Sequence, residues 1–165
     1  MSSTPAPVIV ADSGPLISLS RVRRLDLLRQ LYGEILVPPA VWHEVTVTNA
    51  LAPGAEIVRA ADWIRVRRPN RDTVGFVPGG LGAGEREAFA LTQEIAEAWL
   101  LIDDGAGRRA ARALGLQIIG TVGILKEAKA AGLIVQLRPI LTELQQAGFF
   151  LNAALGEQVL RSVGE

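Results

Sequence analysis

Short apolar runs alternate along this chain with longer stretches in which apolar and polar residues recur at helical spacing. An uncharged run of aliphatic residues that ends at a turn or a charge predicts a buried strand of a parallel sheet. One further run, Ile64-Arg65-Val66-Arg67, alternates apolar and charged residues and predicts an edge or peripheral strand. The predicted strands cover residues 7–11, 34–37, 64–67, 98–102 and 116–119.

The stretches between the strands predict helices. Leucines spaced to form one apolar face predict a helix over residues 15–32, and Gly33 is placed to end it. The pair Pro38-Pro39 predicts the start of a helix over 39–47, and Thr121 is expected to cap a helix that runs to Ala131. The other predicted helices are a short one after Pro53-Gly54, one from about 84 to 96, one over 105–114, and one or two within 137–163.

Strands that alternate with helices are typical of βαβ units. They predict an α/β fold, a three-layer α/β/α sandwich around a central, mostly parallel sheet. With 165 residues, of which 49% are hydrophobic, the chain is expected to be a single domain over residues 1–165. Residues 1–7 are expected to be a disordered or extended N-terminus, and residues 137–165 a helical segment that covers the sheet or forms a subunit contact.

Composition excludes several kinds of chemistry. The chain has no cysteine and a single histidine, His43, which rules out thiol catalysis, disulfides and a typical zinc site. The N-terminus lacks the pattern of a signal peptide, and no apolar run is long enough to span a bilayer, so a cytoplasmic protein without membrane contact is expected. The net charge is zero, but arginines cluster, and they form either ordinary solvated faces or phosphate contacts.

Carboxylates provide the strongest functional signal. Asp12 and the pair Asp103-Asp104 directly follow predicted strands, while Glu44 and Glu85 fall on helices that follow a strand or a glycine-rich loop. Each could simply cap a helix, complement its dipole or lie on the surface. Strand ends of a parallel sheet meet at one edge, however, where several carboxylates repel one another unless a cation lies among them. Such oxygen ligands favour Mg²⁺ or Mn²⁺, and that chemistry suits phosphodiester hydrolysis.

The order of these motifs resembles the PIN-domain family. The resemblance rests on five segments in sequence, and it covers roughly residues 8–150. They are Asp12-Ser13-x-x-Leu16-Ile17, Pro38-x-x-Val41-x-x-Glu44, Gly84-Glu85-x-Glu87-Ala88, Asp103-Asp104-x-x-x-x-Arg109-x-Ala111 and Gly120-Thr121-x-Gly123-Ile124-Leu125.

The resemblance implies a catalytic and metal-binding set of Asp12, Glu44, Glu85 and Asp103. The resemblance also implies that Asp104 is a metal ligand. In toxin members a longer acidic motif stands where this chain has Ile102-Asp103-Asp104-Gly105, so either aspartate could be the closer ligand. Ser13 matches a hydroxyl residue that supports the first aspartate. Arg108 and Arg109 are the arginines expected to hold the substrate.

The function implied is a metal-dependent endoribonuclease, expected to be the toxin-like component of a VapBC-type toxin–antitoxin pair. Its expected partners are an RNA substrate, an antitoxin protein and, as a homodimer, a second copy of the chain. A non-catalytic nucleic-acid- or partner-binding module is the alternative. A phosphotransfer domain is the third, although Gly14 replaces the second aspartate that haloacid-dehalogenase-type phosphatases need.

Overall fold

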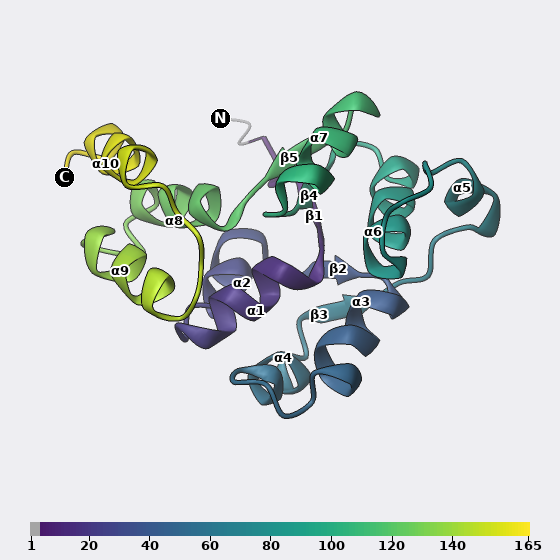
Figure 1. Ribbon diagram of the computed structural model, residues 1–165, viewed down its shortest axis with the longest axis horizontal. Helices are drawn as coiled ribbons and strands as arrows, with labels where there is room; N and C mark the ends of the chain where they lie inside the picture. Colours follow the sequence, from purple (N-terminus) through teal and green to yellow (C-terminus); the bar gives the residue numbers. More distant parts are fainter. Residues whose placement is uncertain (1–3) are drawn as a thin grey trace.

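A computed structural model describes residues 4–165 of the protein (Figure 1). Five parallel strands form one sheet in the order β3-β2-β1-β4-β5. The predicted α/β class, with a parallel sheet flanked by helices, is therefore confirmed. The strands are β1 (Val8–Ala11), β2 (Ile35–Val37), β3 (Ile64–Val66), β4 (Ala98–Leu101) and β5 (Gln117–Ile119).

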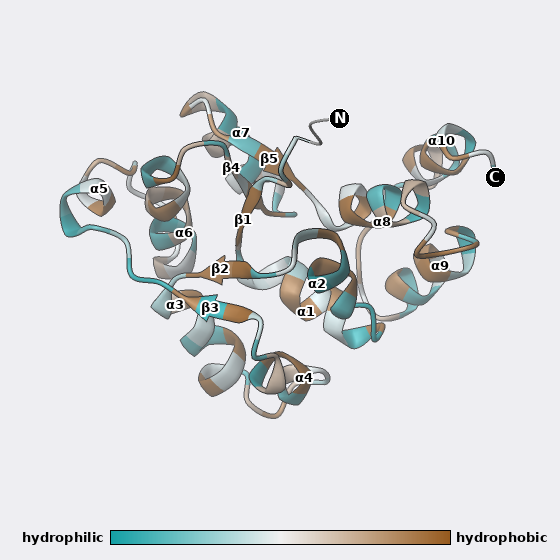
Figure 2. Ribbon diagram, turned by 180° about the vertical axis from the view of Figure 1, so that it is seen from behind, coloured by the Kyte–Doolittle hydropathy of each residue, from teal (hydrophilic) through white to brown (hydrophobic). Residues whose placement is uncertain are grey.

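The burial of each strand follows its sequence pattern. β1 lies in the centre of the sheet, and Ile9, Val10 and Ala11 are fully buried there. In β3, at one edge of the sheet, Ile64 is buried and Arg65 is exposed, as the alternating pattern predicts, whereas Val66 is exposed although the pattern places it on the buried face. In Figure 2, β1 and β2 are coloured mostly as apolar, whereas the helices carry both apolar and polar stretches.

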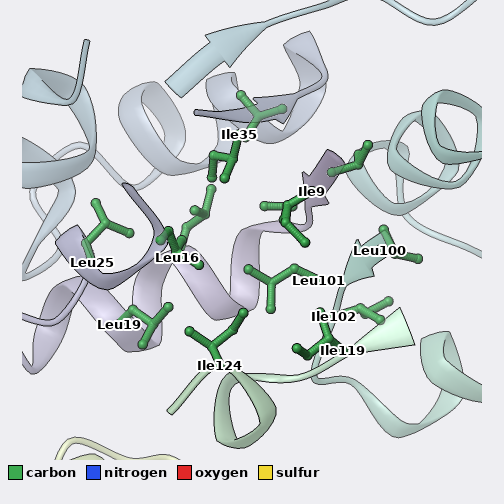
Figure 3. Packing of buried hydrophobic residues seen from close by; sticks show 14 of the residues in the cluster. Ile9, Leu16, Leu19, Leu25, Ile35, Leu100, Leu101, Ile102, Ile119 and Ile124 are labelled. Atoms are coloured by element: carbon green, nitrogen blue, oxygen red, sulfur yellow. The ribbon is translucent and has the colours of Figure 1, made fainter. Parts of the chain in front are cut away.

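Helices connect all the strands. They are α1 (Ser13–Arg21), α2 (Asp26–Tyr32), α3 (Pro39–His43), the π-helix η1 (Glu44–Thr48), α4 (Ala55–Ala60), α5 (Arg71–Gly75), α6 (Ala83–Glu94), α7 (Gly105–Ala113), α8 (Thr121–Ala130), α9 (Arg138–Gln146) and α10 (Ala153–Ser162). In Figure 1, α8, α9 and α10 gather at one end of the molecule and α5 and α6 at the other. Figure 3 shows the core between them, where side chains of the sheet meet leucines of α1.

The single helix predicted over residues 15–32 is wrong. The chain forms two helices, α1 and α2, because it turns at Arg23, whose φ of 56° lies in the left-handed region. Leu25 in the connecting segment is 2% exposed, so its side chain belongs to the core and not to one continuous helix face. Leucine spacing alone could not distinguish a long helix from two short ones that share a core.

Three other local predictions need correction. The helix predicted over 39–47 starts at Pro39, but its second half is the π-helix η1. Helix α5 was not predicted; Asn70 caps it by accepting a hydrogen bond from the amide of Asp72 at 2.9 Å. Thr121 does not cap α8, because Gly120 occupies the cap position.

The C-terminal segment forms the two helices α9 and α10. Val159 and Leu160 of α10 are buried, whereas Leu155 and Phe150 remain exposed. Residues 1–3 of the expected extended N-terminus lie outside the described residues, and residues 4–7 have no regular structure. No helix in the described part of the chain is long and apolar enough to cross a membrane.

Candidate functional site

The topology of the sheet determines where Asp12 lies. From β1 the chain continues to β2 on one side, whereas β4 pairs with β1 on the other side, so the strand order reverses between β1 and β4. Ligands of open parallel sheets bind outside the carboxyl ends of the strands at such a switch point. Ala11 and Leu101, the last residues of these strands, are register partners, and the amide of Asp12 donates to the carbonyl of Leu101 at 2.9 Å. Asp12 thus lies at the switch point.

Asp12 is buried and does not form the capping hydrogen bond that its position at the start of α1 would offer. It occupies the N-cap position of α1, where an aspartate side chain normally accepts a backbone amide hydrogen bond. Among the residues that the structure describes, its carboxylate makes no such capping bond, and the residue is only 7% exposed. Helix capping therefore does not explain why an aspartate stands here.

Glu44 reaches the site through an unusual helix. It is the first residue of η1, and its carbonyl accepts the amide of Asn49 at 3.0 Å and the side-chain amide of Asn49 at 2.9 Å. π-helical turns frequently occur at functional sites because they shift one side chain relative to the regular helix. A Cβ atom at Gly84 of α6 would lie 3.2 Å from Glu44 Oε2, so the glycine allows the carboxylate to approach the first turn of α6.

Glu85 follows Gly84 in α6, and its carboxylate extends toward α7. Glu85 Oε2 would lie 3.5 Å from a Cβ atom at Gly107 in α7, and Asp104 Oδ2 would lie 3.4 Å from the same atom. The carboxylate of Glu85 therefore lies near Asp104, at the start of α7. Helix α6 is held in this position by Glu87, whose Oε2 accepts the amide of Ala40 at 2.8 Å and so ties α6 to α3.

Asp103 has a hydroxyl and an amide as dedicated partners. Its Oδ2 accepts a hydrogen bond from Thr121 Oγ1 at 2.6 Å, and its Oδ1 accepts one from the Thr121 amide at 2.7 Å. Thr121 is fully buried at the start of α8, directly after β5. Sequence reasoning missed this positioning role, because a threonine at a helix start is normally assigned to capping.

Asp104 and Ser13 have local structural roles. Asp104 caps α7, since its Oδ2 accepts the amide of Gly107 at 2.7 Å, which is the capping alternative left open by the sequence. Ser13 is buried at the first position of α1, next to Asp12. The charge of Asp103 raises the pKa of Asp12, whereas Asp104, which caps α7, raises the pKa of Glu85.

The charges of Glu85, Glu44 and Asp103 are close enough to Asp12 to affect its pKa. Burial is the main cause that raises the pKa of Asp12 from 3.8 to about 7. A hydrogen bond from the backbone of Ser13 opposes the increase, and the negative charges of Glu85, Glu44 and Asp103 add to it. Burial followed by the charges of Asp104 and Glu44 also raises the pKa of Glu85.

The pKa of Asp103 is likewise raised by burial, although its two hydrogen bonds from Thr121 and the charge of Arg108 oppose the increase. All three carboxyl groups therefore resist ionisation where they lie, and a nearby cation would relieve that resistance.

These residues fit a hard divalent cation by their chemistry. The oxygens of Asp12, Glu44, Glu85 and Asp103 are the ligands that Mg²⁺ and Mn²⁺ prefer, and the buried Asp12 makes no helix-capping bond. Within residues 4–165, no three acidic or histidine side chains are close enough to form a preassembled metal cluster. The side chains would therefore have to rotate inwards to hold a cation together.

The two arginines expected to hold the substrate differ in their surroundings. Arg108 turns inwards, and its Nη1 donates to the carbonyl of Ile102 at 2.9 Å, which occupies part of its hydrogen-bonding capacity. Burial and the neighbouring Arg112 lower the pKa of Arg108. Arg109 is exposed on α7, and its Nη1 lies near Gly105. Of the two, Arg109 is the more accessible to a ligand.

A cleft of about 420 Å³ opens beside the acidic edge of the sheet. Asp103, Asp104 and Gly14 line it on the side of the strand ends, and the segment around Phe149 and Phe150 lines it on the side of the C-terminal helices. Sequence patterns did not indicate this cleft, because its walls come from three segments that lie far apart in the chain.

Fold and site together define a doubly wound α/β protein with carboxylates at the switch point of its sheet. The family model of DUF3368, described as a PIN domain, matches residues 8–165, so the chain belongs to the PIN-domain family. PIN domains are typically nucleases and are generally metal-dependent. No curated protein matches the chain at a significant level.

Proposed function

We propose that this protein is an Mg²⁺- or Mn²⁺-dependent endoribonuclease that uses Asp12, Glu44, Glu85 and Asp103. The observation that carries the proposal is the buried Asp12 carboxylate. It makes no helix-capping bond in the described chain, and its pKa is raised to about 7, in part by the charges of three other carboxylates. Membership of a family whose members are typically metal-dependent nucleases supports the same conclusion.

Each residue has a distinct part in this proposal. Asp12 and Asp103 come from adjacent strand ends and provide the fixed side of the site, with Thr121 holding the orientation of the Asp103 carboxylate. Glu44 and Glu85 approach from α3–η1 and α6, which Glu87 holds together. A divalent cation held by these groups would supply Lewis acidity, increasing the acidity of water and neutralising charge on a phosphoryl group.

Cleavage of a labelled, structured RNA with EDTA, Mg²⁺ or Mn²⁺ tests the proposal. The wild type should cut only with a cation, and Glu85→Gln should reduce cleavage by at least about 100-fold, because it removes a ligand charge at nearly constant shape. Asp62→Asn is the matched control, since Asp62 is exposed and precedes β3 at the opposite edge of the sheet. Equal cleavage by wild type and Glu85→Gln, or undiminished cleavage in EDTA, would contradict the proposal.

A second candidate is a PIN-like module that binds nucleic acid or a partner without catalysis. The specific observation in its favour is that no preassembled group of three metal-binding side chains exists within residues 4–165. This candidate predicts RNA binding that neither cation converts into cleavage, so the same assay distinguishes the two functions.

We further propose that the protein is the toxin-like component of a VapBC-type pair and that it forms a homodimer. Family membership is the support for both statements. Induced expression should then arrest growth of a bacterial host, and Asp12→Asn should abolish the arrest. Growth arrest that is unchanged by Asp12→Asn would contradict a role that depends on the acidic site, and the mass in solution would test the dimer.

A further inference from the structure

An exposed aromatic side chain stands at the mouth of the cleft beside the acidic edge. Phe150 is 89% exposed, whereas the preceding Phe149 packs against the core. The cleft continues from this segment to Asp103 and Asp104, so one wall is aromatic and the other belongs to the proposed metal site. Its volume of about 420 Å³ lies within the range typical of small-molecule sites.

The segment that carries Phe150 is fixed at both ends. Gly148, with φ of 97°, ends α9, and its amide donates to the carbonyl of Gln145 at 3.0 Å. On the other side, Asn152 caps α10 by accepting the amide of Ala154 at 2.8 Å. The backbone of this segment therefore has little conformational freedom to lose when a ligand stacks on Phe150, which favours binding.

Arg21 provides a positive charge on the same cleft. It is exposed at the end of α1 and lines the cleft, and its Nη1 donates to the carbonyl of Ala147 at 3.3 Å. This bond holds the guanidinium beside the Phe150 segment. The other N–H groups of a guanidinium can still bind phosphate oxygens.

We propose that this cleft is a subsite for one unpaired nucleotide of an RNA strand, in which Phe150 stacks on the base and Arg21 binds the phosphate. The inference rests on the ribonuclease proposal, because the cleft is continuous with Asp103 and Asp104. An aromatic face and a cation beside it are the two elements with which proteins hold single-stranded nucleic acid without reading its sequence. The subsite would thus position an unpaired nucleotide next to the carboxylates.

Binding of a fluorescent single-stranded RNA to proteins that also carry Asp12→Asn tests the subsite without cleavage. Adding Phe150→Ala should weaken binding about tenfold, which is within the range for loss of one stacked base, and Phe150→Trp should retain it. Phe76→Ala is the matched control, because Phe76 is 83% exposed at the end of α5 and does not line the cleft. Phe150 is so exposed that its substitution should leave the thermal midpoint unchanged.

Two further measurements make the test specific. A 2-aminopurine base in the RNA should lose fluorescence on binding, and Phe150→Ala should abolish this quenching, because stacking is its cause. Arg21→Gln should reduce the slope of log Kd against log salt by about 0.7, the value for one phosphate contact on a single strand. A blunt duplex of the same sequence should show no effect of Phe150→Ala.

Equal RNA binding by Phe150→Ala and Phe76→Ala would overturn the subsite, as would failure of the protein to bind single-stranded RNA. A change in oligomeric mass on Phe150→Ala with unchanged RNA binding would also overturn it and would assign Phe150 to a contact between copies. Metal-dependent cleavage by the wild type is measured separately, so the ribonuclease proposal can stand when the subsite fails.

Discussion

Replacing Asp12 by asparagine is expected to stabilise the metal-free protein at neutral and alkaline pH. Asp12 is 7% exposed, and burial together with three neighbouring carboxylates raises its pKa from 3.8 to about 7. Asparagine has nearly the same shape and carries no charge at any pH. The substitution therefore removes the unfavourable buried charge without creating a cavity.

The pH dependence follows from the direction of the pKa shift. Because the folded state holds the Asp12 proton more tightly than the unfolded state, the wild type loses stability as pH rises from about 4 to about 7. Each unit of pKa shift corresponds to about 1.36 kcal/mol, so the full shift sets a ceiling of about 4 kcal/mol above pH 7. Asp12→Asn should equal the wild type near pH 4 and exceed it by up to that amount at pH 8.

Urea unfolding in EDTA at pH 4 and pH 8 measures this difference, and a gain of 2–4 kcal/mol corresponds to roughly 4–16 °C in Tm. Mn²⁺ should have the opposite effect: at about 100 times its Kd it should stabilise the wild type by about 2.7 kcal/mol and Asp12→Asn much less. Asp62→Asn, at the opposite edge of the sheet, should behave like the wild type. A variant that is less stable than the wild type at pH 8 in EDTA would refute the reasoning.

Two other substitutions test how the structure supports the site and the fold. Thr121→Val removes the hydroxyl that donates to Asp103 Oδ2, so urea unfolding should show a loss of about 1–2 kcal/mol. The pKa of Asp103 should rise further, and the pH profile of RNA cleavage should move to higher pH. Gly54→Ala places a Cβ atom 2.5 Å from Ser20 Oγ at a residue with φ of +92°, and should lower stability by about 2 kcal/mol or more. Because Gly54 is far from the carboxylates, Gly54→Ala should leave RNA cleavage at low temperature unchanged. A Tm equal to that of the wild type would contradict the close packing of α4 on α1.

The sequence predicted the sheet well because its strands are short apolar runs that end at recognisable residues. Asp12 after β1 and Asp103 after β4 could be placed at the same edge as soon as the strands were taken to be parallel. The break between α1 and α2 could not be predicted in the same way. Leu25 has the spacing of a helix face, and only the tertiary packing shows that it belongs to a turn.

The partners of the acidic residues depend on contacts between distant parts of the chain. Nothing near Thr121 in sequence indicates that its hydroxyl donates a hydrogen bond to Asp103, which lies 18 residues earlier. The π-helical turn at Glu44 also has no local signature, because it differs from an α-helix by a single hydrogen-bond step. Sequence patterns therefore identified the carboxylates, while the structure was needed to show how they are held.

The pairing of β1 with β4 has a consequence for the folding of the protein during its synthesis. Asp12 is made early in synthesis, yet its neighbour at the switch point, Asp103, and the threonine that orients it, Thr121, emerge from the ribosome much later. Contacts between such distant segments form late in folding, since a long loop must close first. An unfinished chain therefore lacks the complete acidic site, and the proposed nuclease activity could begin only after synthesis has passed β5 and the start of α8.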